Sequence, residues 1–335
     1  MKRIFGVVFL LALAACPGPQ PTGGGGGVGG GGGGAVGISP DSCGKIDTTK
    51  VGRKLYAFLV ASAELDRASL ELERSVHDAC KRMAVELGVS PAGDIKEVCT
   101  RAANELDANL KVSVKSESRL VTRTVPPVCT TSVELTAGFV AQCEASASAD
   151  VNVQCSGSCS GTCNGTCDGQ CAGGAAGGQC NGQCQGTCRG RCSGGCNGYV
   201  DVDASAECKA SAEIRAVTHT ECTEARVEVV RENVTVVDDS KFQKAVAAIN
   251  AGMPAIVKAG VKLERAGKAL GLWVSTGASL VKASGQLVGD LGEKAVCVGG
   301  QLAAVVAATA NIQARFSVSI EVSAKVSASA GAQSR

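Results

Sequence analysis

The sequence predicts an α+β fold: a long helical hairpin or bundle with a long-stranded antiparallel sheet, extended by a Cys/Gly-rich, disulfide-laddered β-hairpin. Three patterns predict it. A heptad seam of apolar and small residues runs through residues 48–87, apolar and polar residues alternate in four later segments, and two five-cysteine arrays lie in residues 155–196. The 335 residues include 33 Lys and Arg and 31 Asp and Glu, so bulk charge does not favour nucleic-acid binding.

Residues 1–15 have the features of a secretory signal peptide, because a cationic start precedes an apolar run that is too short to cross a membrane. The segment Leu13-Ala14-Ala15-Cys16 resembles the lipobox of bacterial lipoproteins, and the resemblance covers about the first sixteen residues. It implies cleavage before Cys16, lipidation of the Cys16 thiol, and a membrane partner held through acyl chains. The residue after Cys16 is Pro17, and not an acidic residue of the kind linked to retention in the inner membrane of some bacteria. Sorting to the outer membrane is therefore expected. An ordinary signal peptide that contains a cysteine is the alternative.

Residues 16–41 are expected to form a lipidated, glycine-rich tether, because this composition cannot bury enough surface to fold. Residues 42–110 are expected to form a helical hairpin. Its first helix should end at Gly88, and Asp94 should cap the second. Cys80 and Cys99 lie on opposite sides of the turn, so we predict that they form a disulfide.

Four segments alternate between apolar and polar residues and are predicted to be long strands of one sheet: 110–125, 129–154, 199–237 and 312–330. Between the last two of these, a region with many glycines and Pro254 predicts two or three helices. The remaining divisions are therefore strands in 111–154, the Cys-Gly hairpin in 155–196, a strand in 197–238, helices in 239–311 and a strand in 312–335.

The two cysteine arrays predict a hairpin with its turn at Ala175–Ala176 and bridges wherever two cysteine numbers sum to 351. Two further pairs outside the arrays obey the same sum, which supports the register independently. The predicted disulfides are Cys155–Cys196, Cys159–Cys192, Cys163–Cys188, Cys167–Cys184, Cys171–Cys180, Cys143–Cys208 and Cys129–Cys222. If Cys16 is lipidated, eighteen of the nineteen cysteines remain, and elimination leaves Cys43–Cys297.

Under this sum glycines also face glycines, for example Gly157 and Gly194, which leaves room for the bridges. Metal binding by thiolates is an alternative, because zinc sites use similar cysteine spacings, and disorder is another. An exported chain favours disulfides. The same register sets Glu144 opposite Glu207 and Asp150 opposite Asp201. Such like-charged pairs predict either solvated carboxylates or, with nearby Asp203, a weak calcium site.

No catalytic constellation, cofactor motif or resident metal site is predicted, and no small-molecule substrate is evident. We therefore expect a non-enzymatic, lipid-anchored envelope protein with a structural or adhesive role, whose partner is another protein or a second copy of this chain. Two alternatives stay open. The protein resembles helical pore-forming toxins in combining long helices with a β-tongue, although its tongue is polar, or it sequesters metal through its cysteines.

Overall fold

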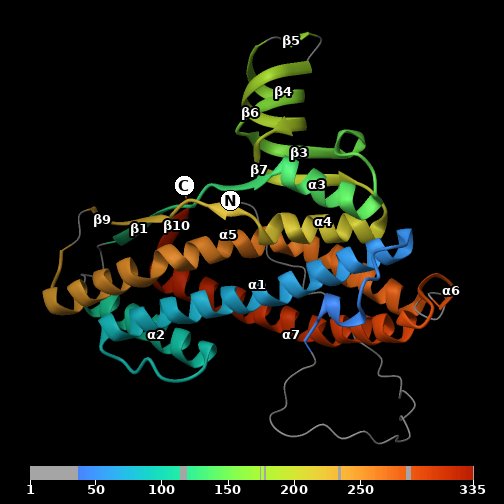
Figure 1. Ribbon diagram of the computed structural model, residues 1–335. Helices are drawn as coiled ribbons and strands as arrows, with labels where there is room; N and C mark the ends of the chain where they lie inside the picture. Colours follow the sequence, from blue (N-terminus) through green and yellow to red (C-terminus); the bar gives the residue numbers. More distant parts are fainter. Residues whose placement is uncertain are drawn as a thin grey trace, which may run out of the picture. The chain divides into compact units, whose positions relative to one another are not determined.

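The computed structural model describes residues 37–113, 119–173, 175–176, 179–232, 235–283 and 288–334. The chain divides into two units, Met1–Ala35 and Val36–Arg335, and all of the described residues belong to the second. The predicted signal peptide, Cys16 and most of the tether lie outside the described residues. The described unit is an α+β structure, as the sequence predicts (Figure 1).

The predicted helical hairpin is confirmed. Helix α1 (Lys50–Leu87) begins after Thr49, whose side chain accepts a hydrogen bond from the Gly52 amide, and ends at Gly88 in the left-handed conformation, with φ 76°. Helix α2 (Ile95–Ser113) begins after Asp94, whose carboxylate accepts from the Glu97 amide at 2.8 Å. These caps satisfy backbone groups that a helix leaves unpaired at its ends.

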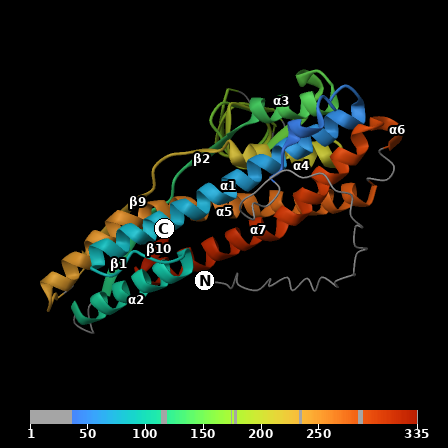
Figure 2. The same cartoon turned by 60° about the horizontal axis from the view of Figure 1, so that its bottom comes forward.

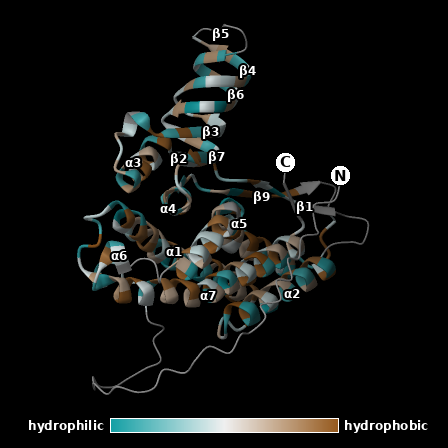
Figure 3. Cartoon of the chain, turned by 90° about the vertical axis from the view of Figure 1, so that its right-hand side faces the viewer, coloured by the Kyte–Doolittle hydropathy of each residue, from teal (hydrophilic) through white to brown (hydrophobic). Residues whose placement is uncertain are grey.

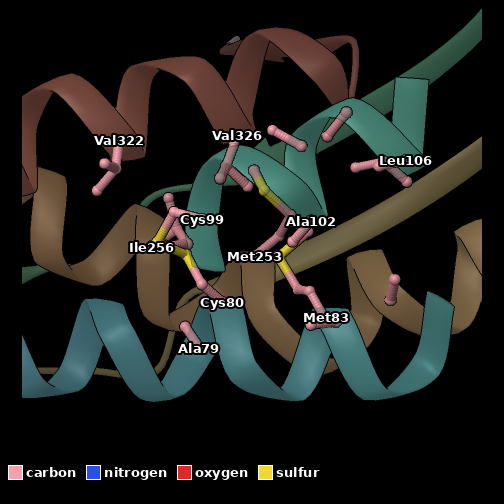
Figure 4. Close-up of a cluster of buried hydrophobic side chains, with 14 of the residues drawn as sticks. Ala79, Cys80, Met83, Cys99, Ala102, Leu106, Met253, Ile256, Val322 and Val326 are labelled. Atoms are coloured by element: carbon pink, nitrogen blue, oxygen red, sulfur yellow. A yellow bond between two sulfur atoms is a disulfide. The ribbon is translucent and has the colours of Figure 1, made fainter. Parts of the chain in front are cut away.

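Helices α1 and α2 pack with α5 (Asp239–Ala283) and α7 (Lys294–Ser329), and every pair among the four is in contact (Figure 2). The short 3-10 helix η1 (Pro40–Cys43) precedes α1, and α6 (Val288–Leu291) lies before α7. Figure 4 shows one of the two cores of this bundle, where the Cys80–Cys99 disulfide joins α1 to α2 beside Met83 and Met253. The second core contains Trp273, whose indole N–H donates to Ser62 Oγ at 2.8 Å.

The predicted strand 312–330 is wrong, because these residues continue α7 as far as Ser329. The buried residues of this part follow spacings typical of one helix face: Ile312, Phe316, Ser319, Val322, Ser323 and Val326. Ile320, which the alternation set on the same face as Val322, is 52% exposed. The alternation was ambiguous here. Residues four positions apart lie on one face of a strand and also on one face of a helix, and Ala favours helices.

The predicted strands 129–154 and 199–237 are wrong in their middle parts, where each contains a helix. The first is β2 (Cys129–Ser132), α3 (Val133–Glu144), the 3-10 helix η2 (Ser148–Asp150) and the beginning of β3 (Asn152–Cys159). The second is most of β7 (Gly195–Asp203), then α4 (Ala206–Thr218), β8 (Glu221–Cys222) and β9 (Arg226–Glu232). In α4, Ala and Cys supply all of the alternating apolar positions except Ile214.

The expectation of one sheet is also wrong, because the described strands form two. In the small sheet, β1 (Arg119–Val125) lies between β10 (Ala332–Ser334) and β9. Of the predicted strand 110–125, only β1 is a strand, since α2 extends to Ser113 and residues 114–118 lie outside the described residues. The larger sheet also contains β4 (Thr162–Ala172) and β6 (Gln179–Ser193). Its order is β4-β6-β3-β7-β2-β8, with β5 (Ala175–Ala176) beside β6.

Candidate functional site

The cysteine hairpin is a coil rather than a flat ladder. Its two arms, β4 (Thr162–Ala172) and β6 (Gln179–Ser193), pair along both of their edges. Along one edge the numbers of paired residues sum to 355, as for Gly165 and Gly190, and along the other they sum to 345, as for Gly165 and Cys180. Strand β3 repeats the two sums with β7 and β6. A flat hairpin pairs along one edge only, so this ribbon is wound upon itself. We call β3 to β7 the cystine coil.

Each turn of the cystine coil uses ten residues of each arm, because the two partners of Gly165, Cys180 and Gly190, are ten positions apart. Figure 1 shows β4 and β6 wound in this way beyond β3 and β7. Ten extended residues cover about 33 Å, which would give a circular turn a diameter of about 10 Å. The Cα atoms of its disulfides are only 5.7 to 5.9 Å apart. The turns are therefore flattened along the disulfides.

The five predicted hairpin disulfides are confirmed: Cys155–Cys196, Cys159–Cys192, Cys163–Cys188, Cys167–Cys184 and Cys171–Cys180. Their sum of 351 falls between the two hydrogen-bonding sums, so each bridge crosses the inside of the coil instead of joining neighbouring positions. The predicted ladder register is consequently wrong. The predicted turn is wrong too, because Ala175 and Ala176 form β5 and pair with Cys180 and Gln179.

Glycines on the inner face bring the backbones close together. A Cβ atom on Gly157 would lie 2.4 Å from the Asn197 carbonyl oxygen, and one on Gly182 would lie 2.1 Å from the Ala172 oxygen. These distances are far inside van der Waals contact, so only glycine fits at these positions. Gly157 faces Gly198 rather than the predicted Gly194, since the pairing sum is 355.

Between Cys155 and Cys196, all of the buried side chains among the described residues are cysteines. Cys163 and Cys188 are fully buried, Cys180 is 2% exposed, and together with Cys184 they form a small core of their own. Figure 3 shows the resulting alternation of hydropathy along β4 and β6. A core of this size is too small to hold a glycine-rich ribbon without cross-links, because glycine loses more backbone entropy on folding than any other residue.

The outside of the coil is polar and nearly neutral. Between Cys155 and Cys196 the only charged residues are Asp168, Arg189 and Arg191. The other outward-facing side chains are mostly hydroxyls and amides of Ser, Thr, Asn and Gln. Such a surface can form many hydrogen bonds with a partner, while it offers little apolar area and little net charge.

Two polar contacts hold the first residues of β7 against helices α4 and α5. We call this part of the cystine coil, which includes Asn197 and Tyr199, its root. The Tyr199 hydroxyl donates to Glu213 Oε1 at 3.0 Å, and Glu213 on α4 is only 4% exposed. Burial and the Glu213 carboxylate raise the pKa of Tyr199 above its ordinary value. Arg265 on α5 donates from Nη2 to Asn197 Oδ1 at 2.6 Å, and burial lowers its pKa. A cavity of about 340 Å³ lies between these contacts.

The predicted like-charged pairs are not formed. Gln154 faces Asp201 in the β3–β7 pair, and Asn152 faces Asp203. One oxygen of Asp201 accepts from Lys209 Nζ at 3.0 Å, so a cation of the protein already neutralises it.

The partner predicted for Asp201, Asp150, lies in η2. Glu207 lies on α4. Glu144, at the end of α3, accepts from the Ser205 amide at 2.8 Å and lies 3.3 Å from Lys54 Nζ. Within the described part of the chain, no three His, Cys, Asp or Glu residues are grouped for a metal ion.

Four further disulfides are present, and all are pairs that the sequence predicts. They are Cys129–Cys222, Cys143–Cys208, Cys80–Cys99 and Cys43–Cys297. The first two join β2 to β8 and α3 to α4, next to the root of the coil. Cys43–Cys297 joins η1 to α7 across 254 residues of sequence. Cys16, the predicted lipidation residue, lies outside the described residues.

Sequence reasoning did not identify the root contacts, because single polar residues such as Asn197 and Arg265 carry no periodic signal. The winding of the coil left one trace in the sequence, namely the Gly two residues after each Cys, which requires close approach on the inner face. Neither a protein-family model, nor a curated protein, nor a solved structure matches this chain.

Proposed function

We propose that this chain is a non-enzymatic, lipid-anchored protein of the outer membrane, and that the cystine coil is its adhesive or interaction element. The observation that supports this proposal is the construction of the coil. Between Cys155 and Cys196 its buried side chains are those of cystines, and its exposed side chains are mostly hydroxyl and amide groups. Such a design gives rigidity and a hydrogen-bonding surface.

The spacing of the bridges supports a rigid element. Successive disulfides close loops of 41, 33, 25, 17 and 9 residues, so each bridge follows the last by four residues in each arm. No segment between two bridges is long enough to unfold by itself. A rigid surface loses little conformational entropy when it binds a partner, which favours affinity.

The proposed anchor is Cys16, on the basis of the Leu13-Ala14-Ala15-Cys16 segment. Nine disulfides in the described residues agree with an oxidising compartment. Incorporation of radiolabelled palmitate by cells that express the full chain tests the anchor. We expect labelling of the native chain and none of a Cys16→Ala variant. Equal labelling of the two would contradict lipidation at Cys16.

Shortening the coil tests the adhesive role. Replacement of residues 163–188 by a four-glycine turn removes three bridges and keeps Cys155–Cys196 and Cys159–Cys192. We expect the shortened protein to lose binding to isolated cell envelopes while its helical circular dichroism is unchanged. A matched control, Thr166→Ala with Thr187→Ala, changes two outward side chains and keeps every bridge. Undiminished binding by the shortened protein would refute the proposal.

A second candidate function is action on membranes, which one observation favours. Two helical segments, Asp239–Gly267 of α5 and Lys294–Ser329 of α7, are long and apolar enough to cross a membrane, and their most apolar 18-residue stretches have mean hydropathies of 1.3 and 1.7. Only 39% and 33% of their most apolar stretches are buried. Leakage of a dye from phosphatidylglycerol–phosphatidylethanolamine vesicles tests this function. Release at micromolar protein would support it, and intact vesicles would exclude it.

Thiolate metal binding, the remaining alternative from the sequence, finds no support in the described residues. All eighteen cysteines from Cys43 to Cys297 are in disulfides, and a sulfur in a disulfide is not a thiolate ligand. A measurement of zinc per chain on protein isolated from the envelope would test this alternative, and about one or more zinc ions per chain would revive it.

A further inference from the structure

An open cleft of about 340 Å³ lies between the outer face of the cystine coil and helix α3. Its polar side is formed by exposed side chains of β4 and β6, among them Thr162, Asn164, Asn181 and Ser193. Its apolar side includes Val133 of α3, Val151 just before β3 and Val153 in β3, which are 5%, 6% and 2% exposed. The volume is at the lower end of the range for small-ligand sites, about 300–1,000 Å³.

The winding of the coil creates the polar side of this cleft. Asn164 pairs with Arg191 along one edge of β4 and with Asn181 along the other. The two asparagines are seventeen positions apart in sequence and become direct neighbours only because the ribbon closes on itself. Side chains on the same face of neighbouring strands stand about 5 Å apart, so one ligand can reach both amides.

The charges of the cleft favour a neutral ligand. Its lining holds one carboxylate, Glu134, and one guanidinium, Arg191. The guanidinium already donates from Nη2 to the Val151 carbonyl at 3.3 Å. A phosphate, sulfate or polyanion would therefore find no surplus of positive charge, while the amides and hydroxyls can each donate and accept hydrogen bonds with neutral groups.

We infer that this cleft binds an N-acetylated amino-sugar glycan. The hydroxyl and acetamido groups of such a sugar both donate and accept hydrogen bonds, as do Asn164 and Asn181. Its acetamido methyl and ring C–H groups are apolar and match the floor of Val133, Val151 and Val153. This inference names a partner for the proposed adhesive role and rests on that role.

Calorimetry with the hexamer of N-acetylglucosamine and the full chain in detergent tests the inference. We expect binding by the native protein, and at least tenfold weaker binding, equivalent to about 1.4 kcal/mol, by Asn164→Ala with Asn181→Ala. Cellohexaose, which has no acetamido groups, should bind at least tenfold more weakly than the N-acetylglucosamine hexamer.

The chain offers a matched control. Gln170 and Gln185 are also a directly paired, exposed amide couple on β4 and β6, and neither lines the cleft. Gln170→Ala with Gln185→Ala should leave the affinity unchanged, and a non-reducing peptide map should show native bridges in both double variants. Absence of binding to the native protein, or an equal loss in the two double variants, would overturn the inference.

Two further arms identify the source of the glycan. Co-sedimentation with purified peptidoglycan sacculi tests the cell's own wall, and co-sedimentation with chitin tests an external polymer. Retention on either polymer that Asn164→Ala with Asn181→Ala abolishes supports the cleft. If the hexamer fails to bind while the shortened coil still loses envelope binding, the glycan inference falls and the proposed adhesive role stands, with a protein as the partner.

Discussion

The tight inner face of the cystine coil predicts that Gly157→Ala disrupts it. The added Cβ would lie 2.4 Å from the Asn197 oxygen and 2.6 Å from the Gly198 Cα. Favourable carbon contacts need about 3.5–4.0 Å, so the backbones must separate by roughly 1 Å. β3 cannot move aside, because β7 and β6 flank it and the bridges at Cys155 and Cys159 hold it on both sides.

Overpacking of this kind costs about 1–3 kcal/mol. The assay is oxidative refolding in a glutathione buffer, followed by a non-reducing peptide map that gives the ratio of native to non-native bridges. Each 1.4 kcal/mol lowers this ratio tenfold if pairing is at equilibrium. We therefore expect Gly157→Ala to lower the ratio by about fivefold or more.

A glycine in open surroundings provides the control. Gly300 lies in α7, and no atom outside its immediate helical neighbours lies within 4 Å of an added Cβ. Gly300→Ala should stabilise the protein by about 0.5–1 kcal/mol, because alanine has the higher helix propensity. If Gly157→Ala recovers native bridges as fully as Gly300→Ala does, the close approach inside the coil is refuted.

Three other changes test the surroundings of the coil. Tyr199→Phe leaves buried Glu213 without its 3.0 Å donor and should cost about 1–3 kcal/mol in denaturant unfolding. Folding raises the pKa of Tyr199 above 10, so the stability that its neutral hydroxyl contributes is complete below pH 10 and is lost as the pH rises above 10. The variant lacks this hydroxyl and should therefore lose less stability in alkali than the native protein. Glu144→Gln should destabilise the protein near pH 7 and match it in acid. Burial raises the pKa of Glu144, but its hydrogen bonds with Ser205 and Lys54 together lower the pKa more, so the net pKa is below the ordinary value. The contribution of Glu144 to stability is therefore present above pH 4.5 and is lost as the pH falls. Replacing Cys143 and Cys208 by serine should cost about 2–4 kcal/mol and leave the other bridges in a peptide map unchanged.

The sequence predicted the bridges better than the strands that carry them. The sum of 351 holds for Cys143–Cys208 although this pair joins two helices rather than two strands. The two arms have equal lengths between their cysteines, so a correct sum does not depend on the secondary structure in between. The heptad seam of α1 was also a dependable signal, because its seam holds large residues such as Leu55, Phe58 and Leu65.

The alternating segments were ambiguous because their apolar positions fit two kinds of secondary structure. In residues 312–330, a period of two serves a strand face and also supplies the fourth-residue contacts of a helix. The packing of α7 against α1, α2 and α5 decided between them. The second edge of the coil was beyond sequence reasoning for a different reason. A sum of 345 appears only when the ribbon closes on itself, which the cysteine spacing does not reveal.

Cross-strand nuclear Overhauser contacts of Asn164 test the coil most directly, because the flat ladder and the coil share the same disulfides. The coil predicts backbone contacts from Asn164 to both Asn181 and Arg191, its neighbours on the two edges of β4. The proposed glycan cleft requires the first of them. A flat ladder with a sum of 351 would instead give a contact from Asn164 to Thr187 and none to Asn181, and that result would contradict the coil.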